Sequence, residues 1–292
     1  MTADSVPIFG NVITDPWTYG FMQRGVLVAM MVSVVGAVVG TFVVLKGLAF
    51  VGDAMAHSTL PGVAVAFTFK ANVLAGAAVA AVLAALGIAF VSRRGRVAFD
   101  TAIGIVFAAS FALGVLILSR QRNYTADLFN FILGDILGIS AGDVWVILAM
   151  TVAVLALVFL FYKELVITSW DPLTAETTGV PATAIQYGLI LALGLTTVVA
   201  IQAVGIVLVV AFLVTPAATG SLLARSLRGI MLVGSVVGVL SAIGGMYISY
   251  YASVASGATI VLVATGFFIL ALLLSPRRGL LRRRWRSEAR EE

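Results

Sequence analysis

The sequence predicts an all-α protein that crosses a membrane about nine times. Of its 292 residues, 61% are hydrophobic and only 11% are charged, whereas soluble domains carry about 25% charged residues. Apolar runs of the roughly 20 residues that a helix needs to cross a bilayer recur along the chain. No loop long enough to form a soluble domain interrupts these runs. We therefore expect one transmembrane domain over residues 1–292.

Breaks at glycine, proline and charged residues divide the chain into nine apolar runs. We expect helices over residues 21–45, 48–69, 73–91, 100–118, 143–161, 185–201, 203–223, 229–251 and 258–275. The boundary near Gln202 requires a tight turn between two runs. The apolar segment 127–140 is too short to cross, so we expect a short helix or re-entrant piece at the surface.

The basic residues predict the orientation, because lysine and arginine near span ends accumulate on the cytoplasmic side. With the C-terminus inside, fourteen basic residues are cytoplasmic and four are outside, namely Arg24, Lys70, Arg120 and Arg122. Nine crossings make residues 1–20 an extracytoplasmic segment, and eight would place it inside. This segment has no basic residue, so it lacks the positive region of a cleaved signal peptide.

Residues 276–292 form a basic cytoplasmic tail with seven arginines. Such a cluster can neutralise nucleic-acid phosphates. Beside a membrane helix, however, it mainly fixes the topology and contacts anionic head groups. We expect membrane lipid, and no nucleic acid, as its partner.

Asp53 and His57 are the most informative residues, because ionisable side chains in apolar runs are costly and are usually kept for function. They lie four residues apart, so a helix presents them on one face. Pro61 follows one turn later. It lacks an N–H, so it frees the carbonyl of His57 or allows a kink, and we expect it to shape the path beside the pair.

A carboxylate and a neutral imidazole together suit Mn²⁺, Fe²⁺ or Zn²⁺, whereas sites for Ca²⁺ or Mg²⁺ usually contain oxygen alone. One chain supplies only two such ligands, and two copies about a two-fold axis would supply four. The spacing also allows another interpretation. In it, Asp53 caps the start of its helix and His57 hydrogen-bonds a neighbouring helix.

The stretch 162–183 is the one long polar connection between runs, and we expect it on the cytoplasmic face. Asp171 followed by Pro172 predicts a helix start, and Gly179 predicts its end. This short amphipathic helix would dock on a soluble partner or rest on the membrane surface.

The residue inventory argues against an enzyme. No lysine follows a glycine, so there is no P-loop, and any ATP hydrolysis must come from a separate chain. The chain has no cysteine and one histidine, which excludes thiolate metal sites and a His-rich zinc centre. Gly-x-Ser-x-Gly is absent. Ser58 is next to His57, but neighbours on a helix point about 100 degrees apart.

Residues 21–67, FMQRGVLVAMMVSVVGAVVGTFVVLKGLAFVGDAMAHSTLPGVAVAF, closely resemble the opening of the metal-type ABC-3 permeases, which import manganese, zinc or iron. Three later segments resemble signatures of that family in the same order: LFNFILGDILGIS at 128–140, YKELVITSWDPLTAETTGVPA at 162–182 and GIVLVVAFLVTPAATGSLLA at 205–224. Together they span most of the chain.

This resemblance implies a type II ABC importer permease fold, shared with cobalamin and siderophore importers, in the bacterial cell membrane. It also implies a permease homodimer, an ABC ATPase dimer on the cytoplasmic side and an extracytoplasmic metal-binding protein. Asp53 and His57 would line the path of a divalent transition metal ion, which is substrate, and no cofactor would be bound permanently. Coupling to the ATPase would involve Asp171, Pro172, Leu173, Glu176 and Gly179.

Docking of the metal-binding protein would use the outer basic residues Arg24, Lys70, Arg120 and Arg122, if they do not simply snorkel at the interface. Two other functions remain open. A secondary transporter or channel would use Asp53 and His57 as a proton relay. An ABC permease for a metal chelate, such as a siderophore or cobalamin, would need a wide and largely uncharged cavity.

Overall fold

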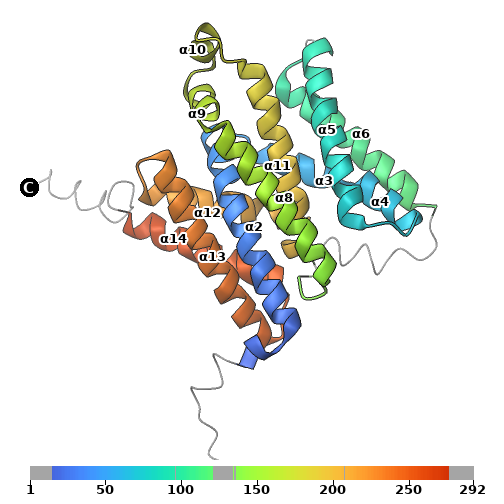
Figure 1. Cartoon of the computed structure of the whole chain (residues 1–292), viewed down its shortest axis with the longest axis vertical. Coiled ribbons are helices and arrows are strands. Elements are labelled where there is room, and N and C mark those ends of the chain that lie inside the picture. The colour runs from blue at the N-terminus through green and yellow to red at the C-terminus, as the bar shows by residue number, and fades with distance from the viewer. Residues whose placement is uncertain (1–14, 96, 121–133, 135, 207, 276–292) are drawn as a thin grey trace, which may run out of the picture.

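The computed structural model describes residues 15–95, 97–120, 134, 136–206 and 208–275, which contain helices and no strand. Figure 1 shows the helices packed side by side, with α10 at one edge of the molecule and the start of α2 near the opposite edge. The elements are η1 (Asp15–Thr18), α2 (Gly20–Leu45), α3 (Ala49–Ser58), α4 (Leu60–Thr68), α5 (Val73–Gly95), α6 (Phe99–Leu118), α8 (Ala141–Leu160), α9 (Tyr162–Trp170), α10 (Pro172–Thr177), α11 (Ala182–Val204), α12 (Val209–Leu223), α13 (Leu227–Ala252) and α14 (Ser256–Leu274).

Seven helices of the described chain are long and apolar enough to cross a membrane, namely α2, α5, α6, α8, α11, α13 and α14. The predicted run 48–69 is instead divided between α3 and α4, and the run 203–223 contains only the 15-residue α12. The predicted all-helical membrane fold is confirmed. The number of nine crossings stays a prediction.

The predicted boundary near Gln202 is wrong for a local reason. Helix α11 continues through Gln202 to Val204, and its C-cap Gly205 has a φ of 80°, in the left-handed region that glycine adopts at little cost. The first part of the polar connection forms an additional helix, α9, which begins directly after Phe161 at the end of α8. The expected short helix over 127–140 falls largely outside the described residues, as do most of segment 1–20 and the whole tail 276–292.

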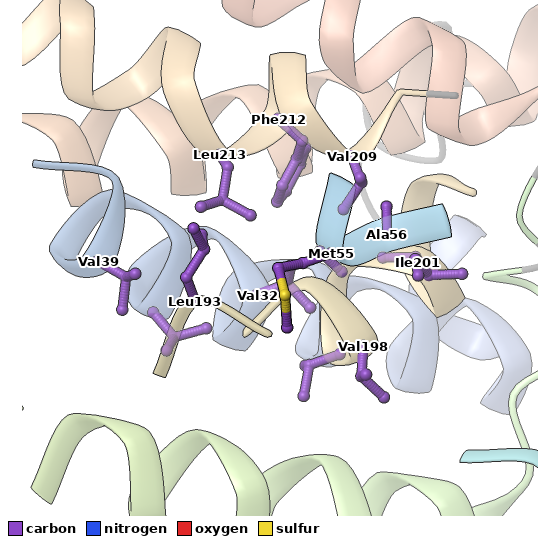
Figure 2. Close-up of a cluster of buried hydrophobic side chains, with 14 of the residues drawn as sticks. Val32, Val39, Met55, Ala56, Leu193, Val198, Ile201, Val209, Phe212 and Leu213 are labelled. Atoms are coloured by element: carbon purple, nitrogen blue, oxygen red, sulfur yellow. The ribbon is translucent and has the colours of Figure 1, made fainter. Parts of the chain in front are cut away.

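Helix α2 lies at the centre of the bundle. In its most apolar 18-residue window 78% of the residues are buried, against 22% in α6 and α8. Next to it, Met55 of α3 is fully buried among side chains of α2, α11 and α12, including Leu193 and Phe212 (Figure 2). The methyl group of Met55 lies directly over Gly194, which has no side chain to exclude it. The core therefore joins segments from both halves of the chain.

Glycines let the backbones approach each other where lipid supplies no hydrophobic force to press helices together. Gly40 of α2 lies so close to the carbonyl of Leu213 in α12 that a Cβ would collide with it. Gly62 of α4 and Gly76 of α5 face each other equally closely. The small-xxx-small spacing in this chain thus serves helix packing.

Short helices from each half of the chain pack on the long helix of the other half. Helix α2 packs mainly on α13 and α12, and α11 packs mainly on α5, α2, α8 and α3. We call α3 and α4 together the α3–α4 arm (Ala49–Ser58 and Leu60–Thr68), and α12 the α12 arm (Val209–Leu223). The α12 arm lies against α2, and α3 of the α3–α4 arm lies against α11, while α4 packs on α5 and α6.

Candidate functional site

Asp53 lies within α3 and does not cap it. The helix begins at Ala49, and its N-cap residue Leu48 makes no side-chain capping bond. Asp53 is therefore in the second turn, where the backbone N–H groups are already bonded within the helix. The interpretation of Asp53 as a cap is wrong, and its carboxylate is left for another use.

His57 and Asp53 lie together on one face of α3, as the spacing predicts. The imidazole Nδ1 is 3.0 Å from the carbonyl oxygen of Asp53 and 3.6 Å from its carboxylate Oδ1. Because a carbonyl oxygen only accepts, this bond requires the proton on Nδ1, and in the neutral imidazole Nε2 then has the lone pair. A backbone carbonyl holding one ring nitrogen is the usual way in which a metal-binding histidine is oriented. The alternative bond from His57 to a neighbouring helix is not found in the described chain.

Both side chains reach the surface of the single chain. The side chain of Asp53 is 44% exposed and that of His57 is 28% exposed. A carboxylate facing acyl chains would be unfavourable. This face is therefore suited to an aqueous path or to contact with another polypeptide.

Two phenylalanines of α6 surround the imidazole. The ring centroid of His57 is 5.6 Å from that of Phe107, nearly perpendicular to it, and 5.8 Å from that of Phe111. These rings restrict the rotation of the imidazole and present it with an apolar surface. They could not be found from the sequence, because they lie on a different helix, as two aromatic residues in an apolar run.

The predicted run 48–69 is divided just before Pro61, where the sequence predicts a freed carbonyl or a kink. Helix α3 ends at Ser58 and α4 begins at Leu60, with Thr59 between them. The Thr59 hydroxyl donates to the carbonyl of Ala56 at 2.7 Å, which caps the end of α3. Pro61 sits in the first turn of α4, where a missing N–H costs nothing. The break ends α3 one residue beyond His57.

No group of three or more histidine, aspartate or glutamate side chains that could hold a metal is found in the described residues. Asp53 and His57 offer one carboxylate and one imidazole nitrogen. Transition metals in proteins generally take at least three or four ligands. One chain is therefore insufficient for a complete metal site at this position.

In the polar connection 162–183, the predicted short helix is confirmed as α10. The Asp171 carboxylate accepts hydrogen bonds from the backbone N–H groups of Leu173 and Thr174 at 3.0 and 3.1 Å, and from the Thr174 hydroxyl at 2.5 Å. These bonds from Thr174 lower the pKa of Asp171. Gly179 ends the segment with a φ of 83°.

The tip of this segment is apolar and uncovered. Leu173 is 76% exposed and Trp170, just before it, is 74% exposed. Glu176 and Pro172 are exposed as well. The prediction included Leu173 but missed Trp170, because a single tryptophan at a helix end reads equally well as a membrane anchor.

Lys46 connects α9 to the central helix. Its Nζ donates to the carbonyl oxygen of Thr168 at 3.2 Å, directly beyond the C-terminus of α2. Partial burial lowers the pKa of Lys46. Helix α9 is thus held against α2 as well as against α8 and α11.

The outer basic residues are dispersed over several helices. Arg24 lies in the second turn of α2 and donates from Nε to the carbonyl of Gly20 at 3.1 Å. Lys70 and Arg120 are exposed and follow α4 and α6, two helices that pack against each other. Arg122 lies outside the described residues. Their docking role stays a prediction.

Comparison with known proteins identifies the family. A family model described as the ABC 3 transport family matches residues 18–275. The chain belongs to this family. Its predicted resemblance is therefore confirmed over nearly the whole length, including the α3–α4 arm and the α9–α10 segment.

Relatives of the chain are membrane subunits named for metal transport. The manganese transport system membrane protein MntC of Halalkalibacterium halodurans is 43% identical over 275 residues, covering 94% of each chain. A membrane protein of Haemophilus influenzae that is named for iron transport is 35% identical, over 94% of this chain and 96% of its own. In the solved structure of PsaBC from Streptococcus pneumoniae in complex with Fab, one chain is similar with a TM-score of 0.83. It is 35% identical, over 94% of this chain and 99% of that one.

Family membership and the seven apolar helices both indicate a location in a membrane. The chain is a multi-pass bacterial membrane protein of the permease type, as the sequence predicts.

Proposed function

We propose that this chain is the membrane-spanning permease of an ATP-driven importer for divalent transition metal ions, with Mn²⁺ as the first candidate. The names of its relatives support this choice, since manganese is the metal named for the relative that is 43% identical. The protein would have the type II ABC importer fold with nine crossings, the α3–α4 arm and α12 being two of them.

The observation that carries the proposal is the arrangement of Asp53 and His57. A carboxylate and an imidazole whose Nε2 lone pair is free lie side by side, with Nδ1 held by a backbone carbonyl. An oxygen and a nitrogen ligand favour a borderline ion over Ca²⁺ or Mg²⁺. Partial ligation by one chain also suits transport, because an ion in transit must be released.

Two copies of the chain would complete the site. If the exposed faces of α3 meet across a two-fold axis, two carboxylates and two imidazoles surround one ion. The chain has no native cysteine, so single-cysteine variants test this directly. We expect His57→Cys to cross-link two copies with a short thiol-specific reagent, while Thr215→Cys in α12 does not. Absence of cross-linking at 57, in membranes that contain the folded variant at the wild-type amount, would contradict the pairing.

The cytoplasmic tip would receive the ATPase. Trp170 at the end of α9 and Leu173 in α10 are exposed apolar side chains on this tip. On the outer side, an acidic metal-binding protein would meet Arg24, Lys70, Arg120 and Arg122. Exchange of Arg120 and Arg122 for glutamate should weaken its binding, and unchanged affinity would exclude this role.

Metal uptake into proteoliposomes tests the function. The chain, reconstituted with its ATPase and its metal-binding protein, should accumulate Mn²⁺ only when ATP is present, with Zn²⁺ and Fe²⁺ as competitors. Accumulation driven by a proton gradient without ATP would instead favour a secondary transporter. Transport of an iron chelate in preference to the free ion would favour a metal-chelate permease.

A further inference from the structure

A groove of about 890 Å³ opens on the side of the bundle, away from Asp53 and His57. It lies between α2, the junction of α8 and α9, and α13, and no residue of α3, α4 or α6 lines it. Most of the lining is apolar, as at Val34, Val38 and Leu232. It is therefore a separate feature from the proposed ion path.

One end of the groove is charged. Lys163, Glu164 and Arg228 lie there, beside Tyr162. Arg228 is in the first turn of α13, and Ser235, at the far end of the α13 lining, is seven residues later. Seven residues of helix span about 10 Å. The groove thus runs from the helix ends about 10 Å into the apolar layer, and this end is on the same side as α9 and α10.

Its outer wall consists of side chains that face the surroundings of the bundle. Leu160 is 75% exposed and Leu232 is 67% exposed. In a membrane, such side chains contact acyl chains. A lipid molecule is accordingly the ligand that reaches this groove without crossing any barrier.

The charged end of the groove determines which lipid head group is complementary to it. Lys163 and Arg228 are positive and Glu164 is negative, so the end has a net charge of +1 (two positive minus one negative). The Arg228 guanidinium is held 5.5 Å above the ring of Tyr162. The Oε2 atom of Glu164 is buried and has no hydrogen-bond partner within the described chain. The chain itself encloses this oxygen, so the two cations are the groups that this end offers to a ligand, and the complementary ligand carries one negative charge.

We propose that this groove binds phosphatidylglycerol from the cytoplasmic leaflet. Its single phosphate charge matches the Lys163 and Arg228 side. One acyl chain lies along Val34, Val38 and Leu232. Phosphatidylethanolamine and phosphatidylcholine both have no net charge and lack this match.

Native mass spectrometry of the full-length chain, released from nanodiscs of defined lipid mixtures, tests this assignment. We expect phosphatidylglycerol to be retained about tenfold more than phosphatidylcholine, a ratio that one charge-assisted hydrogen bond supplies. Arg228→Glu should remove most of this preference. Arg225→Glu is the matched control, because Arg225 is exposed near the same helix end but does not line the groove, and should retain the preference.

A second variant tests the groove without changing charge. Ser235→Trp fills the apolar end and should also lower retention at least about fivefold, since the acyl chain is displaced. Thermal unfolding in phosphatidylcholine nanodiscs, unchanged from wild type, shows that each variant is folded. Equal losses in Arg225→Glu and Arg228→Glu would overturn the proposal, because they would reveal a general charge effect. Equal retention of phosphatidylethanolamine would overturn it as well.

Discussion

The α3–α4 arm and the α12 arm have the same place in their two halves but different chemistry. Each follows a long central helix and packs on the central helix of the other half. Each contains a proline, Pro61 in the first turn of α4 and Pro216 inside α12. The α3–α4 arm carries Asp53 and His57, whereas α12 has no ionisable residue.

This difference teaches that packing and ion chemistry are separable in the fold. Both arms are pressed tightly against neighbouring backbones, at Gly62 and Gly76 in one half and at Gly40 and Leu213 in the other. Only one arm is broken near its centre and exposes polar groups. A single chain therefore has ionisable ligands on one arm, and a symmetric site requires a second copy.

The largest effect is expected from removing the two ligands. The double variant Asp53→Ala, His57→Ala should lower the rate of Mn²⁺ uptake by more than about 100-fold, because it removes the ionic contacts themselves. Thr215→Val in α12 has nearly the same shape as the native side chain and should change uptake less than about twofold. Uptake is normalised to the amount of permease in the membrane. Normal uptake by the double variant would remove the functional distinction between the arms.

Packing should be sensitive in both arms. Gly62→Ala places a Cβ against the carbonyl of Gly76, and Gly40→Ala places one against the carbonyl of Leu213. Each should lower the free energy of unfolding by about 1–3 kcal/mol, as overpacking does. Gly104→Ala in α6 meets nothing within 4 Å and is the control. Thermal unfolding in detergent measures the three variants, and equal stability of Gly62→Ala and Gly104→Ala would contradict the observed backbone contact.

Replacing the two prolines should affect uptake less than removing the two ligands does, and the two replacements should differ from each other. Pro61→Ala restores an N–H that can bond to the carbonyl of His57 and join α3 to α4, which would turn the Asp53 and His57 face. We expect uptake to fall about tenfold, since small displacements of a functional group have effects of this size or larger. Pro216→Ala should change uptake little, because α12 is already continuous. A larger loss at Pro216 than at Pro61 would reverse the assignment of roles.

The smallest effect lies outside both arms, at the cap of α10. Hydrogen bonds from Thr174 hold the pKa of Asp171 below its ordinary value. The stabilisation is therefore fully present above about pH 4, near the pKa of an unperturbed aspartate, and is lost as the pH falls through the lower folded-state pKa. Hydrogen exchange at Leu173 and Thr174 should accelerate in that range relative to Asp171→Asn, whose amide oxygen caps without titrating. Identical pH profiles would contradict the prediction.

The long helices could be predicted from apolar runs alone, because each must cover about 30 Å of hydrocarbon whatever its neighbours are. The arms could not. Whether Pro61 kinks a helix or divides it depends on how Thr59 is bonded, and the shortness of α12 follows from the left-handed turn at Gly205. The helical state of α9 depends on its packing against α11 and the anchor from Lys46.

For the candidate site, a period of four residues was sufficient to place Asp53 and His57 on one face. This spacing did not decide whether Asp53 caps α3 or is available as an ion ligand, since that depends on where α3 begins. The aromatic neighbours Phe107 and Phe111 could not be found either. They meet His57 only because α3 and α6 pack together, and one sequence contains no record of which distant helices touch.

The bond from Lys46 to Thr168 has a mechanical consequence. It joins the end of α2 to α9, at the start of the segment that is predicted to face the cytoplasm. A displacement of the exposed Trp170 and Leu173 would reach α2 through this bond, and would reach α8 and α11 through their contacts with α9. Since α2 also touches α12 and α13, both halves of the bundle would receive it.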